Sequence, residues 1–123
     1  MKRTGALVAF TCVSTVEQAY CAAKASADWV IPYVGRLRRA GTDPSERISH
    51  MARLFRRGDA PPRIFAASPK SAADVVEATL AGADDVTASP QVIKHLLADP
   101  LTESACAQFD GAWRRFQSEL GAR

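Results

Sequence analysis

Strand-like segments alternate strictly with amphipathic helical segments along this chain. Three short, mainly apolar runs, at residues 6–11, 29–33 and 63–67, and a fourth strand-like segment at residues 84–88 are separated by stretches whose apolar residues recur at helical spacing. Continuous apolar runs of this length are typical of parallel strands covered by helices. The pattern predicts an α/β fold of four parallel βα units, followed by a C-terminal helix that starts at a Thr102 cap.

Capping signals and apolar spacing predict where the helices begin and which faces they bury. Asp43 and Pro44 suit an N-cap and a first helical turn, and Ser71 with Asp74 suits a capping box. The region from residue 34 to residue 42 is interpreted as a loop. The expected buried stripes are Ile48, Met51, Ala52 and Phe55; Val75, Val76, Thr79 and Leu80; Ile93 and Leu97; and Ala105, Phe109, Ala112 or Trp113, Phe116 and Leu120.

The length of the chain limits how large the sheet can be. With 123 residues and 47% apolar content, residues 1–123 are expected to form one domain with a core of their own. A complete (βα)8 barrel needs about 250 residues, so four units make at most half of one. Thr11, Tyr33 and Arg36 stand at successive strand ends, where an α/β barrel collects its catalytic groups.

Charge and residue usage narrow the class of partner. The net charge is only +3, but residues 36–63 hold eight arginines against three carboxylates, a local charge of +5 that suits an anion such as phosphate. Arg53, Arg56 and Arg57 lack interleaved aromatic residues that could stack on bases, so we expect no nucleic-acid partner. No apolar run approaches the roughly eighteen residues of a membrane span, so we expect no membrane partner.

Cysteine and histidine usage indicates the compartment and the lack of a metal. Cys12, Cys21 and Cys106 are odd in number and widely spaced, which favours a reducing compartment, the cytoplasm, with all three thiols buried. His50 and His95 have no carboxylate or cysteine neighbours at metal-ligand spacing. We therefore expect no metal and no cofactor.

Several segments resemble a known family in their order and spacing. The matching segments are residues 11–19, 22–27, 32–36, 66–68, 80–84 and 95–102. Together they are similar to the C-terminal half of the short transaldolases and fructose-6-phosphate aldolases. This resemblance implies strands five to eight of a TIM (βα)8 barrel, in a family that forms a Schiff base between a fourth-strand lysine and a ketose. It also implies a truncated barrel, because that lysine and the Thr-Asn-Pro motif belong to the other half.

The resemblance gives four residues specific roles. Thr11 matches a hydroxyl that helps to hold the catalytic water, and Tyr33 matches a phenol that joins the water in proton transfer in aldolase-type members. Arg36 and Ser68 match the phosphate site. The plainer alternatives are a β-branched strand residue, a packed tyrosine, a solvated charge and a helix cap, respectively. Arg38 and Arg39 depart from the Asp-rich stretch often found there in the family, and we expect both to be solvated.

Two classes of function stay open. A Schiff-base lysine must be desolvated or electrostatically depressed, and Lys2, Lys24 and Lys94 are expected to be solvated. Lys70 follows a strand end but also suits an ordinary position before a cap. The chain is either the half of a sugar-phosphate aldolase that needs an upstream half-barrel polypeptide, inactive when isolated, or a non-catalytic remnant, a sugar-phosphate-binding or structural half-barrel. In either class the unpaired sheet edges predict a homo-oligomer.

Overall fold

A four-stranded parallel sheet forms the centre of the fold. The computed structural model describes residues 5–122. The strands lie in the order β1-β2-β3-β4, and all three neighbouring pairs are parallel. Their bounds are β1 (Ala9–Thr11), β2 (Trp29–Ile31), β3 (Arg63–Ala67) and β4 (Asp85–Thr87). All four predicted strands are present, although three are shorter than the segments that predicted them.

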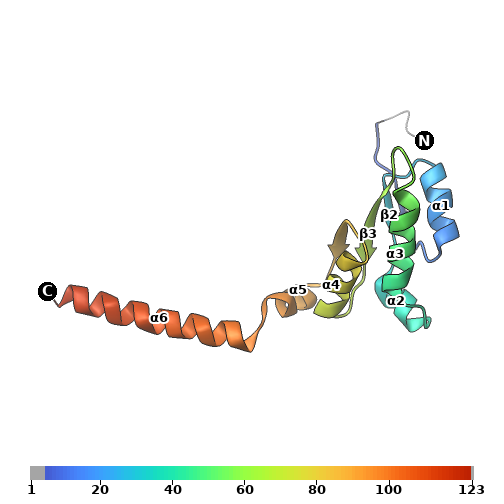
Figure 1. Ribbon diagram of the computed structural model, residues 1–123. Helices are drawn as coiled ribbons and strands as arrows, with labels where there is room; N and C mark the ends of the chain where they lie inside the picture. The colour runs from blue at the N-terminus through green and yellow to red at the C-terminus, as the bar shows by residue number, and fades with distance from the viewer. Residues whose placement is uncertain (1–4, 123) are drawn as a thin grey trace.

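Six helices alternate with these strands or follow them (Figure 1). They are α1 (Val16–Lys24), α2 (Val34–Arg39), α3 (Pro44–Phe55), α4 (Ala72–Leu80), α5 (Pro90–Leu97) and α6 (Pro100–Gly121). Asp43 caps α3 by accepting from the Ser45 N–H, and Ser71 with Asp74 forms the predicted capping box of α4. The last helix begins two residues before the predicted Thr102 cap, because the Asp99 side chain accepts from the Thr102 N–H instead.

Strand register divides the sheet into two chemically different faces. Val30, Ile64 and Ala66 alternate with their neighbours onto one face and join the helical residues Ile48 and Met51 in the hydrophobic core. The opposite face carries Trp29, Ile31 and Phe65, which are only half-buried. On this open face, the Trp29 and Phe65 ring centroids are 5.7 Å apart and the Arg63 guanidinium lies 4.5 Å from the Trp29 ring centroid.

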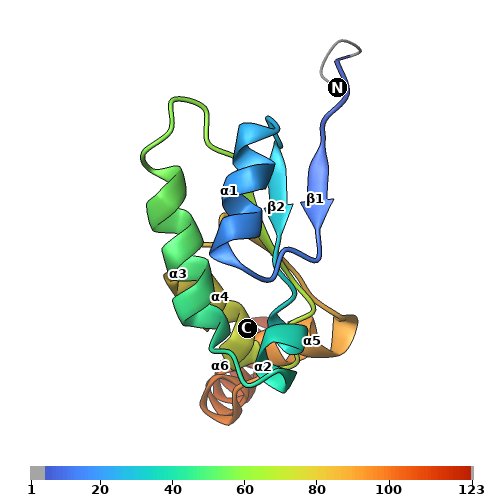
Figure 2. The ribbon, with the colours of Figure 1, turned by 90° about the vertical axis from the view of Figure 1, so that its right-hand side faces the viewer.

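This arrangement confirms the predicted fold class. Four parallel strands alternate with helices, the helices build their core on one face of the sheet, and the other face stays open, as in half of an α/β barrel. Figure 2 shows α1 lying in front of β2, with β1 at one side of the sheet. No helix within residues 5–122 is long and apolar enough to cross a membrane.

Several predicted buried positions are exposed instead. In α4 the buried residues are Asp74 and Ala78, whereas Leu80 is 82% exposed. In α5 it is Val92, not Ile93 or Leu97, that is buried. The α6 helix extends away from the rest of the chain (Figure 1), so its apolar stripe packs against none of the sheet. We call this set of residues the α6 stripe: Ala105, Phe109, Trp113, Phe116 and Leu120.

The prediction that the three cysteines are buried is also wrong. Cys12, Cys21 and Cys106 are all exposed free thiols. Cys12 lies in a left-handed turn directly after β1, with φ of 57°, and the core residues of α1 are Ala19 and Ala22 rather than Cys21. Cys106 lies on the projecting helix α6. A small apolar side chain does not by itself decide which face of a helix it occupies.

Candidate functional site

The sequence-predicted residues lie along the carboxyl ends of the parallel strands. Thr11 is the last residue of β1 and pairs with Ile31, whereas Tyr33 pairs with Ala67 through an isolated parallel bridge. Because Ile31 and Tyr33 are two residues apart, Thr11 and Tyr33 belong to the same open face, separated by about 7 Å along the strand direction. Ser68 follows β3 directly. These three residues therefore share one rim of the sheet.

The unpredicted helix α2 places Arg36 beside Tyr33. Tyr33 is the N-cap residue of α2, and its carbonyl accepts from the Arg36 N–H. The Arg36 guanidinium lies 5.5 Å from the centroid of the Tyr33 ring, within the range of a cation–π contact. Arg36 is exposed and Tyr33 is half-buried. The expected phosphate residue and the expected catalytic phenol are thus in contact.

A backbone contact joins α2 to the loop that carries Ser68. The Gly35 N–H donates to the Ser68 carbonyl over 3.1 Å, and Ser68 has a left-handed φ of 61°. A side chain at position 35 has no room, because a Cβ there would lie 2.8 Å from the Ser68 carbonyl oxygen. Arg36 and Ser68 therefore come from two segments that touch, as a shared anion site requires.

Lys70 lies at the same rim. Its Cε would be 3.0 Å from a Cβ built at Gly35, so its aliphatic chain lies against the bare backbone of α2. Lys70 is exposed and lines an open groove of about 400 Å³ together with Ser68, Thr87, Ser89 and His95. Of the other lysines, Lys24 and Lys94 are exposed on helices, and Lys2 lies outside the described residues.

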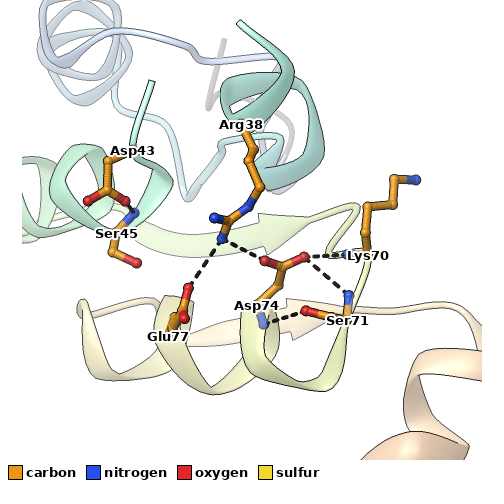
Figure 3. A network of polar contacts seen from close by, with 7 residues as sticks. All are labelled: Arg38, Asp43, Ser45, Lys70, Ser71, Asp74 and Glu77. Atoms are coloured by element: carbon orange, nitrogen blue, oxygen red, sulfur yellow. Dashed lines mark hydrogen bonds and ion pairs between the residues drawn. The ribbon is translucent and has the colours of Figure 1, made fainter. Parts of the chain in front are cut away.

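A polar network behind the rim joins α2, α4 and the loop between β3 and α4 (Figure 3). Arg38 Nη2 lies 2.6 Å from Asp74 Oδ1 and 3.2 Å from Glu77 Oε2. The other Asp74 oxygen, Oδ2, accepts from the backbone N–H groups of Lys70, at 2.7 Å, and Ser71, at 3.1 Å. The expectation that Arg38 is merely solvated is therefore wrong.

Asp74 is the charged centre of this network. Its residue is only 6% exposed, and burial alone would raise the pKa of its carboxyl group. The Lys70 N–H and the Arg38 charge outweigh burial and lower that pKa below its ordinary value. The Asp74 charge in turn raises the pKa of Arg38. The carboxylate is therefore ionised wherever the protein is near neutral pH.

Comparison with known proteins identifies the family to which this chain is similar. Residues 1–121 match the family model described as Transaldolase/Fructose-6-phosphate aldolase. The chain belongs to this family. A probable transaldolase of Mesorhizobium japonicum is 34% identical over 94% of this chain and 53% of its own length. Two further relatives are also probable transaldolases. That of Phenylobacterium zucineum is 40% identical over 80% of this chain and 45% of its own length. That of Maridesulfovibrio salexigens is 37% identical over 92% of this chain and 53% of its own length.

The extent of these matches shows how much of a family member the chain represents. It spans about half the length of the relatives that it matches. A half-length match agrees with a sheet of four strands, where a complete barrel has eight.

Within residues 5–122 there is no group of three or more His, Cys, Asp or Glu side chains that could hold a metal ion.

Proposed function

We propose that this chain is the C-terminal half of a transaldolase-like aldolase that acts on sugar phosphates, with the Schiff-base lysine supplied by another polypeptide. The observation that carries the proposal is the open face of the sheet, whose rim holds Thr11, Tyr33 and Ser68 at successive strand ends. Barrel enzymes build their sites from this rim. A chain that spans half of a family member would contribute half of such a site.

Each rim residue has a chemical task in this proposal. A phenol beside an imine exchanges protons with it through a bound water, and the Thr11 hydroxyl both donates to and accepts from that water. The Arg36 guanidinium and the Ser68 hydroxyl hold the substrate phosphate, with Lys70 adding a second positive charge at the groove. The lysine of the other half forms the imine.

The unpaired surfaces support a partner chain. Edge strands β1 and β4 each pair on one side only within the described residues, and free edges of parallel strands invite further strands. An upstream half-barrel polypeptide with four more strands would close the sheet and bury Trp29 and Phe65. The exposed α6 stripe supports a homo-oligomer in addition, because isolated amphipathic helices bury their apolar face against a neighbour.

One observation favours the second candidate function, a non-catalytic half-barrel that binds sugar phosphates or has a structural role. Lys24, Lys70 and Lys94 are all exposed, so none is desolvated as a Schiff-base lysine must be. The chain alone then binds the phosphate group without forming an imine. For either function, three exposed free thiols suit a reducing compartment such as the cytoplasm.

Complementation with the missing half tests the proposal. The chain would be co-expressed with the part of the Mesorhizobium japonicum relative that it does not match. Cleavage of fructose 6-phosphate and trapping of the imine with borohydride would then be measured by mass spectrometry. We expect an adduct on the supplied lysine and none on this chain. Tyr33→Phe should reduce the rate at least tenfold, whereas Tyr20→Phe, on the exposed face of α1, should not.

Two results would contradict this proposal. A borohydride adduct on Lys70 of the isolated chain would show that the half-barrel has its own nucleophile. A folded complex without activity, in which the phosphate of the sugar still raises the melting temperature, would favour the non-catalytic half-barrel. In that thermal assay Arg36→Ala should remove most of the shift and Arg53→Ala, on α3, should not. Equal losses would indicate diffuse charge rather than a phosphate site.

A further inference from the structure

We propose that Arg38 and Asp74 are a positioning pair that fixes the loop at residues 68–71 against α2 and so sets Ser68 relative to Arg36. The inference rests on the proposed function for its consequence, since Ser68 and Arg36 are the proposed phosphate ligands. It does not rest on that function for the contact itself. Neither Arg38 nor Asp74 is assigned to touch the substrate.

Asp74 is placed where three segments meet. It belongs to the first turn of α4, its Oδ2 accepts from two backbone N–H groups of the loop, and its Oδ1 accepts from Arg38 on α2. The carboxylate is buried, whereas the Arg38 side chain is 52% exposed. A nearly buried carboxylate with both oxygens occupied cannot move without breaking several charge-assisted hydrogen bonds. It therefore transmits the position of α2 to the loop.

The loop needs such a constraint because of Ser68. A serine with φ of 61° lies in the left-handed region, which non-glycine residues adopt only where the surroundings hold them. The structure supplies two ties: the Gly35 N–H on the Ser68 carbonyl and the Arg38–Asp74 pair on the other end of the loop. Loss of either tie lets the loop relax and changes the position of the Ser68 hydroxyl relative to α2, which carries Arg36.

Helix capping alone does not account for these contacts. The capping box of α4 needs only the reciprocal bonds between Ser71 and Asp74. The bond from the Lys70 N–H and the ion pair with Arg38 lie outside that motif. Arg38 makes this contact across 36 residues of the sequence, which local capping cannot account for.

Amide hydrogen exchange of the full chain tests the positioning directly. In Arg38→Ala we expect the Gly35, Lys70 and Ser71 amides to exchange about five- to tenfold faster, because their acceptors are no longer held in place. The Ile64 amide, which donates to Asp84 in the sheet, should keep its rate. Arg39→Ala removes the same charge one residue away and should change none of these rates. Arg38→Lys keeps a charge for Asp74 and should restore part of the protection.

Binding of inorganic phosphate, followed by NMR titration, then tests the consequence. Arg38→Ala should raise the Kd about fivefold relative to Arg39→Ala, with Arg38→Lys between them. Unchanged exchange at Gly35, Lys70 and Ser71 in Arg38→Ala would overturn the positioning role. If Arg38→Ala unfolds, the Ile64 amide will exchange faster to the same extent as the loop amides. In that case exchange at Gly35, Lys70 and Ser71 in the folded Arg38→Lys variant decides whether the pair positions the loop. Faster exchange in a chain that does not bind phosphate would keep the positioning pair and refute the proposed phosphate site.

Discussion

Substituting Gly35 by alanine tests how closely α2 approaches the loop at Ser68. In an open helix this change is favourable, because alanine has the higher helix propensity by about 0.5–1 kcal/mol. At Gly35, however, the new Cβ would lie 2.8 Å from the Ser68 carbonyl oxygen, well inside van der Waals contact. The obstacle is backbone and not the end of a flexible side chain. The loop or the helix must therefore shift.

The structure decides which of the two effects is larger. Overpacking of this kind costs about 1–3 kcal/mol. The same shift stretches the bond from the Gly35 N–H to Ser68, which contributes a further 0.5–1.5 kcal/mol, roughly. These costs exceed the propensity gain, so Gly35→Ala should lower the free energy of unfolding by about 1–3 kcal/mol. For a chain of this size that corresponds to a fall in Tm of about 4–12 °C.

Urea denaturation followed by far-UV circular dichroism measures this change, and Gly111→Ala is the matched control. Gly111 lies within α6, and a Cβ there meets no heavy atom within 4 Å. The control should therefore increase the helical signal at 222 nm and should not lower the unfolding midpoint. A Gly35→Ala protein as stable as the parent, or more stable, would refute the close approach between α2 and the β3–α4 loop.

Two further predictions concern acid stability and association. Because the pKa of Asp74 is lowered in the folded state, the ionised Asp74 stabilises the fold fully above the ordinary carboxyl pKa of about 3.9. This stabilisation should disappear as the pH falls through the lower pKa of the folded state. In a Tm series from pH 6 to pH 2, Asp74→Asn should therefore lose less Tm than the parent. Sedimentation velocity at micromolar concentration should show dimers or larger species. The double variant Phe109→Ser with Phe116→Ser should shift these species toward monomer, whereas the control Gln108→Ser should not. A parent that sediments as a monomer would contradict a docking role for the α6 stripe.

The sheet could be predicted from the sequence because its signals are local. Each strand is a short segment between turn or cap residues, three of the four segments are mainly apolar, and the Ser71 and Asp74 capping box lies within four consecutive residues. The stripe of α3, which contains Ile48, Met51 and Phe55, was also predictable because this helix packs against the sheet of the same chain. Local pattern and tertiary packing agree wherever the partner surface is present in the chain.

The polar network could not be predicted in the same way. Arg38 and Asp74 are 36 residues apart, and no periodicity joins them. Helix α2 was interpreted as a loop because its six residues include Gly35 and three arginines. Its only large apolar residues are Val34 and Leu37. Such a short helix is stabilised by its buried contacts and not by propensity. The departure from the Asp-rich stretch at Arg38 led only to the prediction of a solvated side chain, because the sequence did not indicate Asp74 as its partner.

The wrong burial predictions themselves carry information about the missing surfaces. Leu80, Leu97 and the α6 stripe have the spacing of buried helix faces, yet they are exposed in this chain. A periodic apolar stripe predicts that a helix buries one face, but it does not specify which polypeptide covers that face. The stripe of α3, which packs against β3 and the neighbouring helices α1 and α4, was predicted correctly. Among the helical stripes the errors lie in α4, α5 and α6, and Cys12 and Cys21 are further errors at the β1 end of the sheet. For α6, which packs against none of the sheet, a neighbouring copy would supply the partner. The same reasoning predicts that a complementing half-barrel should protect the exposed β4 edge before it alters the core around Met51.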